Sequence, residues 1–147
     1  HESERRGETF VTRKIAIAAA RISLGIQDEL KLGNLEAIRD RGYAPEYVEG
    51  MWQMMQHSEP DDYVLATNTG YSVKEFAQMA FEAVNLDWEK YVKIDARYFR
   101  PTEVDALIGD YSKAQSAFGW KPRTFVPEMA KIMVSKELER AHQEAMY

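Results

Sequence analysis

The stretch DARYFRPTEVD, residues 95–105, places cationic and acidic side chains around a proline. Arg100 directly precedes Pro101, and Glu103 and Asp105 follow. A guanidinium group is planar and donates two parallel charge-assisted hydrogen bonds, which suits phosphate oxygens. The proline restricts the backbone beside Arg100 and would hold this donor pair in place before a ligand arrives. A carboxylate such as Glu103 accepts hydrogen bonds from sugar hydroxyls, so the stretch suits a sugar carried on a nucleoside diphosphate.

Further cations are predicted on loops and helix starts, where they could contact the same anion. They are Arg5, Arg6, Lys14 and Arg39. Most charged side chains on protein surfaces have no binding role, so a solvated surface charge is the alternative for each of them. For Arg39 a second alternative is an ion pair with its neighbour Asp40.

Familiar catalytic motifs are missing from the sequence. No glycine-rich dinucleotide fingerprint follows a strand, and there is no P-loop. No serine stands in a nucleophile-elbow motif. The histidines are His1, His57 and His142, too few for a histidine metal cluster. The residues therefore favour binding over a complete catalytic set.

Composition narrows the class of protein. The chain has 147 residues, of which 45% are hydrophobic and 29% charged, as in an ordinary globular domain with its own core. Its formal net charge is −5, whereas nucleic-acid binders usually carry a basic surface. The absence of cysteine excludes disulfides and is compatible with the cytoplasm. No apolar run approaches the roughly 20 residues of a membrane span, so we expect a cytoplasmic protein without nucleic-acid or membrane partners.

The elements that must position these side chains mix helices with short strands. The helical spacing of the apolar stripe Val11, Ile15, Ala18 and Ile22 predicts a helix over residues 9–24, which Gly25 would end. Pro45 suits the first turn of a second helix. The predicted buried stripe of that second helix is Val48, Met51, Trp52 and Met55.

Ser72 and Glu75 predict a capping box for a third helix. Its stripe would be Val73, Phe76, Ala77, Ala80, Phe81 and Val84. Gly119 would stop a short helix, Trp120 would pack inside, and the last helix would run from 126 to 143. Strands are expected over residues 29–34, 63–67 and 91–95, and an ordered loop over 33–46. Together these elements predict a single α/β or α+β domain.

Several stretches together resemble the GDP-mannose 4,6-dehydratase family, in order and spacing over essentially the whole chain. They are HESERRGETFVTRKI, LGNLEAIRDRGYAPEYVEGMW, ATNTGYSVKEF and DARYFRPTEVDALIGDYSKAQSAFGWKP. The resemblance implies an extended short-chain dehydrogenase/reductase, a lyase with an N-terminal Rossmann domain for NADP and a smaller mixed α/β domain for the sugar nucleotide. Residues 1–147 would be that second domain without its Rossmann domain, and a first residue other than methionine fits a piece of a longer protein.

The resemblance also implies roles for particular residues. His1 and Arg6 match cofactor-binding positions. The substrate-binding positions are Val11, Lys14, Asn34, Arg39, Arg100 and Glu103. The whole enzyme would convert GDP-mannose to GDP-4-dehydro-6-deoxy-mannose with bound NADP, as a cytoplasmic homo-oligomer in GDP-fucose biosynthesis. The family's catalytic residues lie in the Rossmann half, so we expect no catalytic residue, no metal and no dehydratase activity from this chain alone.

Two other interpretations stay open. One is a stand-alone sugar-nucleotide-binding or scaffold protein without catalysis, and the other is a different sugar-nucleotide epimerase or reductase. The sequence also departs from the resembling family, mainly in the predicted loop 33–46. The departures are Glu4, Ile38, Arg41, Tyr43 and Tyr111, where proline, lysine, tryptophan, histidine and proline are common.

Overall fold

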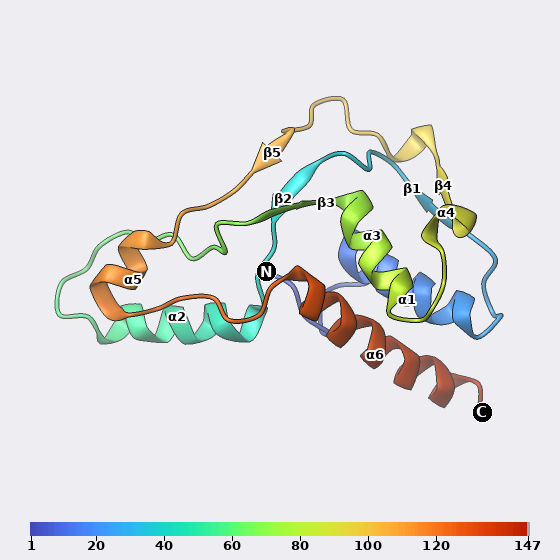
Figure 1. Ribbon diagram of the computed structural model, residues 1–147. Coiled ribbons are helices and arrows are strands. Elements are labelled where there is room, and N and C mark those ends of the chain that lie inside the picture. The colour runs from blue at the N-terminus through green and yellow to red at the C-terminus, as the bar shows by residue number, and fades with distance from the viewer. Residues whose placement is uncertain (147) are drawn as a thin grey trace.

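Three helices pack against one another and enclose the hydrophobic core in the computed structural model, which describes residues 1–146. They are α1 (Val11–Ser23), α3 (Val73–Glu82) and α6 (Val126–Glu144), and they lie together at one end of the molecule (Figure 1). The buried face of α1 is rich in alanine, which lets bulky side chains such as Phe76, Phe81 and Met133 fit against it. Burying each such side chain contributes about 1.5–3 kcal/mol. The stripes predicted for α1 and α3 are therefore confirmed.

Local signals in the sequence set the helix ends. The Ser72 hydroxyl accepts a hydrogen bond from the Glu75 N–H at 3.0 Å, and the Glu75 carboxylate accepts one from the Ser72 N–H at 2.7 Å. The predicted capping box is thus confirmed. Gly25 lies just beyond α1 and Gly119 just beyond α5 (Ser112–Phe118), with φ angles of 71° and 75°. Glycine adopts this left-handed conformation at little cost, so both predicted stops are confirmed.

Two small sheets connect the helical core to the rest of the chain. In one, β1 (Leu30–Leu32) pairs in parallel with β4 (Val92–Ile94), which follows the short helix α4 (Trp88–Tyr91). In the other, the central strand β2 pairs with one parallel and one antiparallel neighbour. Its strands are β2 (Ile38–Asp40), antiparallel β3 (Gly70–Ser72) and parallel β5 (Ala106–Leu107).

The two parallel pairings bring two connections side by side. The chain runs from β1 to β2 and, much later, from β4 to β5, so the segments 33–37 and 95–105 both link the first sheet to the second (Figure 1). The second connection includes the single 3₁₀ turn Ala96–Tyr98. The predicted strands over 29–34 and 91–95 are confirmed as β1 and β4, and the fold is mixed α/β as expected.

The region predicted as a loop, residues 33–46, contains the strand β2 and the start of α2 (Ala44–Gln56). The prediction was wrong because β2 is short and charged and shows no apolar alternation. Its identity as a strand comes from its partners β3 and β5, which lie far along the chain. Local sequence does not reveal such pairing.

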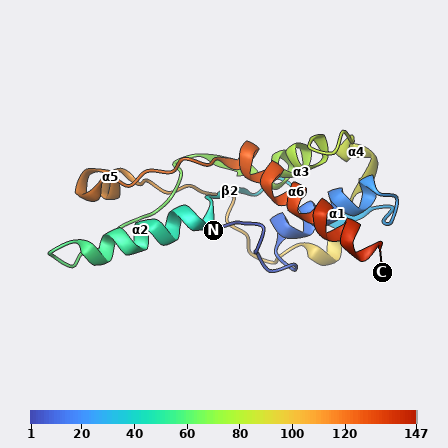
Figure 2. The same cartoon turned by 90° about the horizontal axis from the view of Figure 1, so that it is seen from below.

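Helices α2 and α5 project away from the helical core as a second part of the molecule (Figures 1 and 2). Trp120, only 2% exposed, packs between them and is the centre of a small aromatic cluster with Tyr47 and Tyr111. Its indole N–H donates to the carbonyl oxygen of Glu46 at 2.8 Å. The predicted packing role of Trp120 is confirmed.

The predicted buried stripe of α2 points outward, so that prediction was wrong. Its members are exposed by 46% to 81%: Val48, Met51, Trp52 and Met55. The opposite side is buried instead, through Glu46, Tyr47 and Gly50. A Cβ atom on Gly50 would lie 2.8 Å from the indole nitrogen of Trp120, so the glycine lets α2 approach that ring. Spacing identifies an apolar face of a helix, but it does not say whether anything covers that face.

No strand forms over residues 63–67 within the described chain, contrary to the prediction from their β-rich composition. The segment is instead held at its end by Asp40. That carboxylate accepts hydrogen bonds from the Thr67 hydroxyl at 2.6 Å, the Asn68 N–H at 3.0 Å and the Gly109 N–H at 3.1 Å. A strand needs a ladder partner as well as suitable residues.

Candidate functional site

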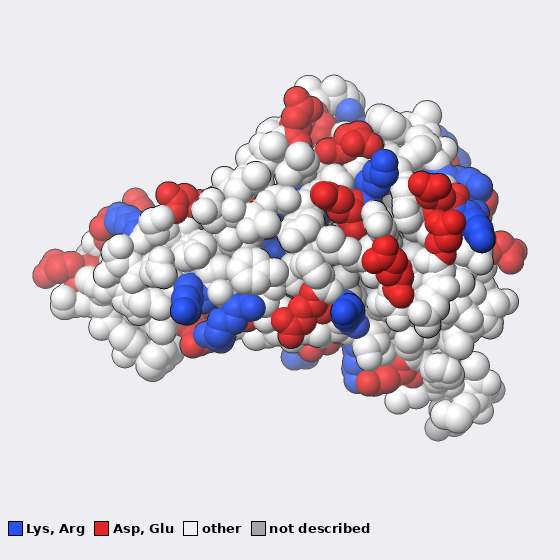
Figure 3. Space-filling model, viewed as in Figure 1, with Lys and Arg blue, Asp and Glu red and all other residues white. Residues whose placement is uncertain are grey.

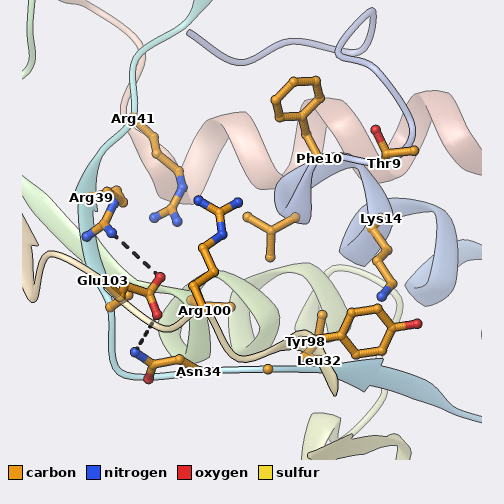
Figure 4. A pocket seen from close by; sticks show the side chains of 14 residues that line it. Thr9, Phe10, Lys14, Leu32, Asn34, Arg39, Arg41, Tyr98, Arg100 and Glu103 are labelled. Atoms are coloured by element: carbon orange, nitrogen blue, oxygen red, sulfur yellow. Dashed lines mark hydrogen bonds and ion pairs between the residues drawn. The ribbon is translucent and has the colours of Figure 1, made fainter. Parts of the chain in front are cut away.

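A cavity of about 430 Å³ opens where the start of α1, the two side-by-side connections and β2 meet (Figure 4). Pockets for small ligands typically measure about 300–1,000 Å³. All six predicted substrate-binding residues line it, although they are spread over the chain: Val11, Lys14, Asn34, Arg39, Arg100 and Glu103. Eight further residues complete the lining: Thr9, Phe10, Leu32, Gly33, Ala37, Arg41, Val73 and Tyr98. The fold therefore gathers the predicted residues, while their binding role stays a prediction.

Gly33 fixes the distance between the two connections. A Cβ atom at this position would lie 2.5 Å from the carbonyl oxygen of Tyr98, which is backbone and cannot swing away. Only glycine allows this approach. The 95–105 connection is also tied at both ends, since the Asp95 N–H donates to Leu32 and the Ile38 N–H donates to Asp105, each at 2.8 Å.

Glu103 is the acidic centre of the cavity and is held by two partners on the other connection and on β2. Its carboxylate accepts a hydrogen bond from the side-chain amide of Asn34 at 2.9 Å and lies 3.7 Å from Nη2 of Arg39 (Figure 4). Arg39 also donates from Nη1 to the carbonyl oxygens of Ile38 and Val104, each at 2.7 Å. These contacts fix the orientation of a carboxylate that keeps acceptor capacity for a ligand.

The alternative ion pair between Arg39 and Asp40 does not form in the described structure. The Asp40 carboxylate instead accepts hydrogen bonds from the backbone N–H groups of Thr67, Asn68 and Gly109, on the side of β2 away from Arg39. Neighbouring residues of a strand point to opposite faces, which separates the two charges. Arg39 is thereby free to pair with Glu103.

Lys14 supplies a cation at the helical wall of the cavity. Its ammonium group donates to the carbonyl oxygen of Lys31 at 2.7 Å and lies 4.0 Å above the centre of the Tyr98 ring. A cation over an aromatic face is attracted electrostatically and loses freedom of movement. Val11 begins α1 beside it, and the preceding residue Phe10 makes no side-chain cap, so the positive end of the helix dipole also faces this region.

Two arginines, Arg41 and Arg100, line the cavity and point into it (Figure 4). Arg41 directly follows β2 and is only 5% exposed. Its Nη1 donates to the carbonyl oxygen of Tyr71 on β3 at 2.9 Å. Burial lowers the pKa of Arg41 below its usual value; the nearby Glu2 carboxylate acts in the opposite direction, and Arg39 lowers the pKa further.

The two predicted cofactor-binding residues do not line the cavity. The ring of His1 lies 4.1 Å from that of Tyr47. The guanidinium of Arg6 lies 3.7 Å above the ring of Phe10, and its Nε is 3.4 Å from the Glu2 carboxylate. Among the described residues these two side chains form no common cradle, and their role in cofactor binding stays a prediction.

Arg97 and Arg5 also lie outside the cavity. Arg97 forms an ion pair with Asp95 at 2.6 Å, and Arg5 is exposed. The hydrogen bond from Arg97 lowers the pKa of Asp95 to about 2. The role of Arg97 is therefore local, on the short turn that precedes Arg100.

Sequence reasoning missed Arg41 as a lining residue. A signal was available, because Arg39 and Arg41 alternate in IRDR and alternate residues of a strand share a face. The predicted loop hid this signal. The stacking of Lys14 on Tyr98 had no local signal, since it depends on the pairing of β1 with β4.

Other kinds of site find little support in residues 1–146. No three His, Cys, Asp or Glu side chains in this part of the chain come together as metal ligands would. None of its helices has both the length and the apolar character of a membrane span. Both signs of charge are interspersed on the face that Figure 3 shows, without a continuous basic patch there.

Comparison with known sequences gives a consistent set of relatives. Residues 1–133 match the family model described as GDP-mannose 4,6 dehydratase. The chain is 54% identical over 144 residues to GDP-mannose 4,6 dehydratase 2 of Arabidopsis thaliana, which covers 98% of this chain and 39% of that protein. It is 50% identical to the GDP-mannose 4,6-dehydratase of Sinorhizobium fredii, covering 94% of this chain and 44% of that protein. The chain spans about two fifths of the length of these curated relatives.

Solved structures share the fold at low sequence identity. RMD from Pseudomonas aeruginosa, complexed with NADPH, superposes with a TM-score of 0.83 at 19% identity, over 92% of this chain and 44% of that chain. The dTDP-glucose 4,6-dehydratase of Bacillus anthracis, in complex with NAD, gives a TM-score of 0.78 at 10% identity, over 96% and 43%. At such identities the likeness establishes the fold alone.

Proposed function

Because the chain belongs to the GDP-mannose 4,6-dehydratase family, we propose that it is the part of such an enzyme that binds GDP-mannose. Both the family and the mixed α/β fold of an extended short-chain dehydrogenase/reductase were predicted from the sequence and are confirmed. One observation carries the functional proposal. The six predicted substrate-binding residues come from separate segments, yet all of them line one cavity of suitable size.

The cavity offers complementary groups for each part of a nucleoside diphosphate. Arg100 presents its fork to phosphate oxygens, and Lys14 adds a second positive charge at the start of α1. Glu103, oriented by Asn34 and Arg39, would accept hydrogen bonds from the ribose hydroxyls. The apolar side chains of Val11 and Val73 provide a wall for the remaining, less polar part of the ligand.

We further propose that the whole protein converts GDP-mannose to GDP-4-dehydro-6-deoxy-mannose with NADP, as a cytoplasmic homo-oligomer in GDP-fucose biosynthesis. The relatives named for the dehydratase activity support the reaction, and the NADPH complex of the RMD neighbour supports the cofactor. His1 and Arg6 would add to a cofactor site formed mostly by other residues. Because the resemblance places the family's catalytic residues in the Rossmann half, we expect no dehydratase activity from this chain alone.

Calorimetry with three nucleotide sugars tests the proposal. The purified chain is titrated with GDP-mannose, UDP-glucose and dTDP-glucose under identical conditions. Tightest binding of GDP-mannose is expected. A preference for UDP-glucose or dTDP-glucose would indicate a different sugar-nucleotide enzyme, and no binding of any of the three would reject the pocket as a substrate site.

A further inference from the structure

Arg41 is the most deeply buried charge that lines the cavity. It is only 5% exposed, yet it has no ion pair within 4 Å among residues 1–146. A guanidinium has five N–H donors, and the structure pairs one of the two terminal nitrogens with the carbonyl oxygen of Tyr71. The side chain otherwise points into the cavity (Figure 4). A buried charge is costly unless an opposite charge compensates for it.

The acids near Arg41 are already engaged with other groups. Glu2 is the carboxylate that most favours its charge, but Glu2 accepts a hydrogen bond from the Thr12 hydroxyl at 2.5 Å and pairs with Arg6 at 3.4 Å. Glu103, the acid that lines the cavity, is held by Asn34 and Arg39. The protein's own carboxylates therefore leave Arg41 without a direct partner.

Other cations face Arg41 and increase the need for an anion. Arg39 lies on the same face of β2, and Arg100 points toward the same space from the 95–105 connection (Figure 4). Among the described residues, the acids nearest in sequence to Arg100 pair with other arginines, Glu103 with Arg39 and Asp95 with Arg97, and Arg100 itself forms no ion pair. Arg39 already disfavours the positive charge of Arg41, and a bound anion would offset that repulsion.

A purely structural role does not require the charge. The hydrogen bond to Tyr71 joins β2 to β3, which are already paired in register through Arg39 and Tyr71. A neutral donor could make the same bond. A negatively charged ligand would compensate for the positive charge buried at this point.

We propose that Arg41 and Arg100 together form a two-arginine phosphate site in the cavity, and that Arg41 is a ligand-contacting residue of this chain. The proposal rests on the function given above and makes it more specific. The pocket would select for ligands with two linked phosphates, because each guanidinium can engage a separate phosphate group. A nucleoside monophosphate would satisfy only one of them.

The test compares binding of GDP, GMP and inorganic pyrophosphate by calorimetry, using the whole chain. The main variant is Arg41→Gln, which keeps a hydrogen-bond donor and removes the charge. Affinity for GDP and pyrophosphate should fall about 10- to 100-fold, as expected for loss of a charge-assisted hydrogen bond, and affinity for GMP should fall less. Arg41→Lys, which keeps the charge, should retain more affinity than Arg41→Gln.

Two controls distinguish a specific loss of ligand binding from unfolding of the variant and from a general reduction in positive charge. Arg123→Gln removes an exposed cation that lies outside the cavity lining and pairs with Glu49 of α2 at 2.6 Å. This substitution should leave GDP affinity unchanged. Circular dichroism and thermal unfolding show whether each variant is folded. If Arg41→Gln does not fold, the Nε–Hε resonance of Arg41 in the unaltered chain should still shift on addition of pyrophosphate, and its failure to shift would overturn the proposal.

The outcomes distinguish this inference from the broader function. If Arg41→Gln binds GDP as tightly as the unaltered chain, the two-arginine site is wrong while the GDP pocket stands. If the unaltered chain binds pyrophosphate through Arg41 but does not bind GDP, the phosphate site stands and the proposed function fails. If it binds neither, both are rejected.

Discussion

The side-chain amide of Asn34 donates a hydrogen bond to the carboxylate of Glu103 at 2.9 Å, although the two residues are 69 positions apart in the sequence. The contact joins the two connections between the sheets and orients the acid at the centre of the cavity. It exists because β1 pairs with β4 and β2 pairs with β5, both in parallel.

Replacing Glu103 with alanine should weaken the binding of GDP. Loss of hydrogen bonds from the ribose hydroxyls to a carboxylate would cost about 1.5–3 kcal/mol. The matched ligand is 2′,3′-dideoxy-GDP, which lacks those hydroxyls. Calorimetry should show that Glu103→Ala reduces the affinity for GDP much more than for the dideoxy analogue. Equal losses for both ligands would mean that Glu103 does not contact the ribose.

Arg100→Ala should weaken GDP binding by roughly 1.5–3 kcal/mol, the range for losing hydrogen bonds to a charged group. Arg97→Ala is the matched control, since Arg97 is a cation on the same connection that pairs with Asp95 outside the cavity. It should change the affinity far less. Calorimetry that gave the same affinity for Arg100→Ala and the unaltered chain would exclude Arg100 from the site.

Gly33→Ala should disturb the cavity through its backbone. The new Cβ atom would lie 2.5 Å from the carbonyl oxygen of Tyr98, so the 95–105 connection must move. We expect a loss of about 1–3 kcal/mol in the free energy of unfolding, typical of overpacking, together with weaker GDP binding. Denaturant unfolding and calorimetry measure the two effects.

Gly25→Ala is the control for this substitution. Gly25 has a φ angle of 71° and open space around it, so alanine there should cost about 1–2 kcal/mol of stability through backbone conformation alone. GDP affinity should be unchanged in Gly25→Ala. Unimpaired GDP binding by folded Gly33→Ala would show that the contact with Tyr98 does not shape the site.

Asp95 should titrate well below an ordinary aspartate. The hydrogen bond from the Arg97 side chain lowers the pKa of Asp95 to about 2, from the usual 3.8. Because the pKa is lowered in the folded state, the ion pair favours folding at neutral pH, and this contribution is lost as the pH falls from about 4 to about 2. Carboxyl ¹³C chemical shifts measure the midpoint, and Arg97→Gln should raise it toward 3.8. A midpoint near 3.8 in the unaltered chain would contradict the ion pair.

The chain should self-associate through the outward stripe of α2. Val48, Trp52 and Met55 expose apolar surface on one face of that helix, and contiguous surface of this kind favours association. Sedimentation velocity at rising concentration should show larger species, and Trp52→Lys should reduce them. Ile26→Lys, at an exposed apolar residue beyond α1, should have little effect. A monomer at all concentrations would reject the prediction.

Helix ends and the core stripes of α1 and α3 could be predicted because their signals are local. Ser72 and Glu75 lie three residues apart and cap each other, and Phe76, Ala80 and their neighbours repeat at helical spacing. The stripe of α2 has the same spacing but faces outward. Which side of a helix is covered depends on distant residues, here Trp120 and α5, and spacing alone does not contain that information.

The candidate site was predicted through resemblance rather than spacing. Asn34 and Glu103 have no local pattern that joins them, and only the strand pairings bring them together. Arg41 was missed because residues 33–46 were predicted as a loop, which hid the alternation of Arg39 and Arg41 along the chain. Its burial comes from β3 and the N-terminal segment, which a local analysis of IRDR does not place beside it.

Most charged residues that line the cavity, which we call its rim, lie outside the three packed helices. This separation affects how ligand preference can evolve. Apart from Lys14, the charged groups of the cavity lie on the 95–105 connection and on or directly after the strand β2, not on α1, α3 or α6. Substitutions at those rim positions can alter which nucleotide is accepted while the helices keep their packing. The same three-helix framework can thus diversify toward new ligands by small changes at the rim, without the loss of stability that rebuilding a core would bring.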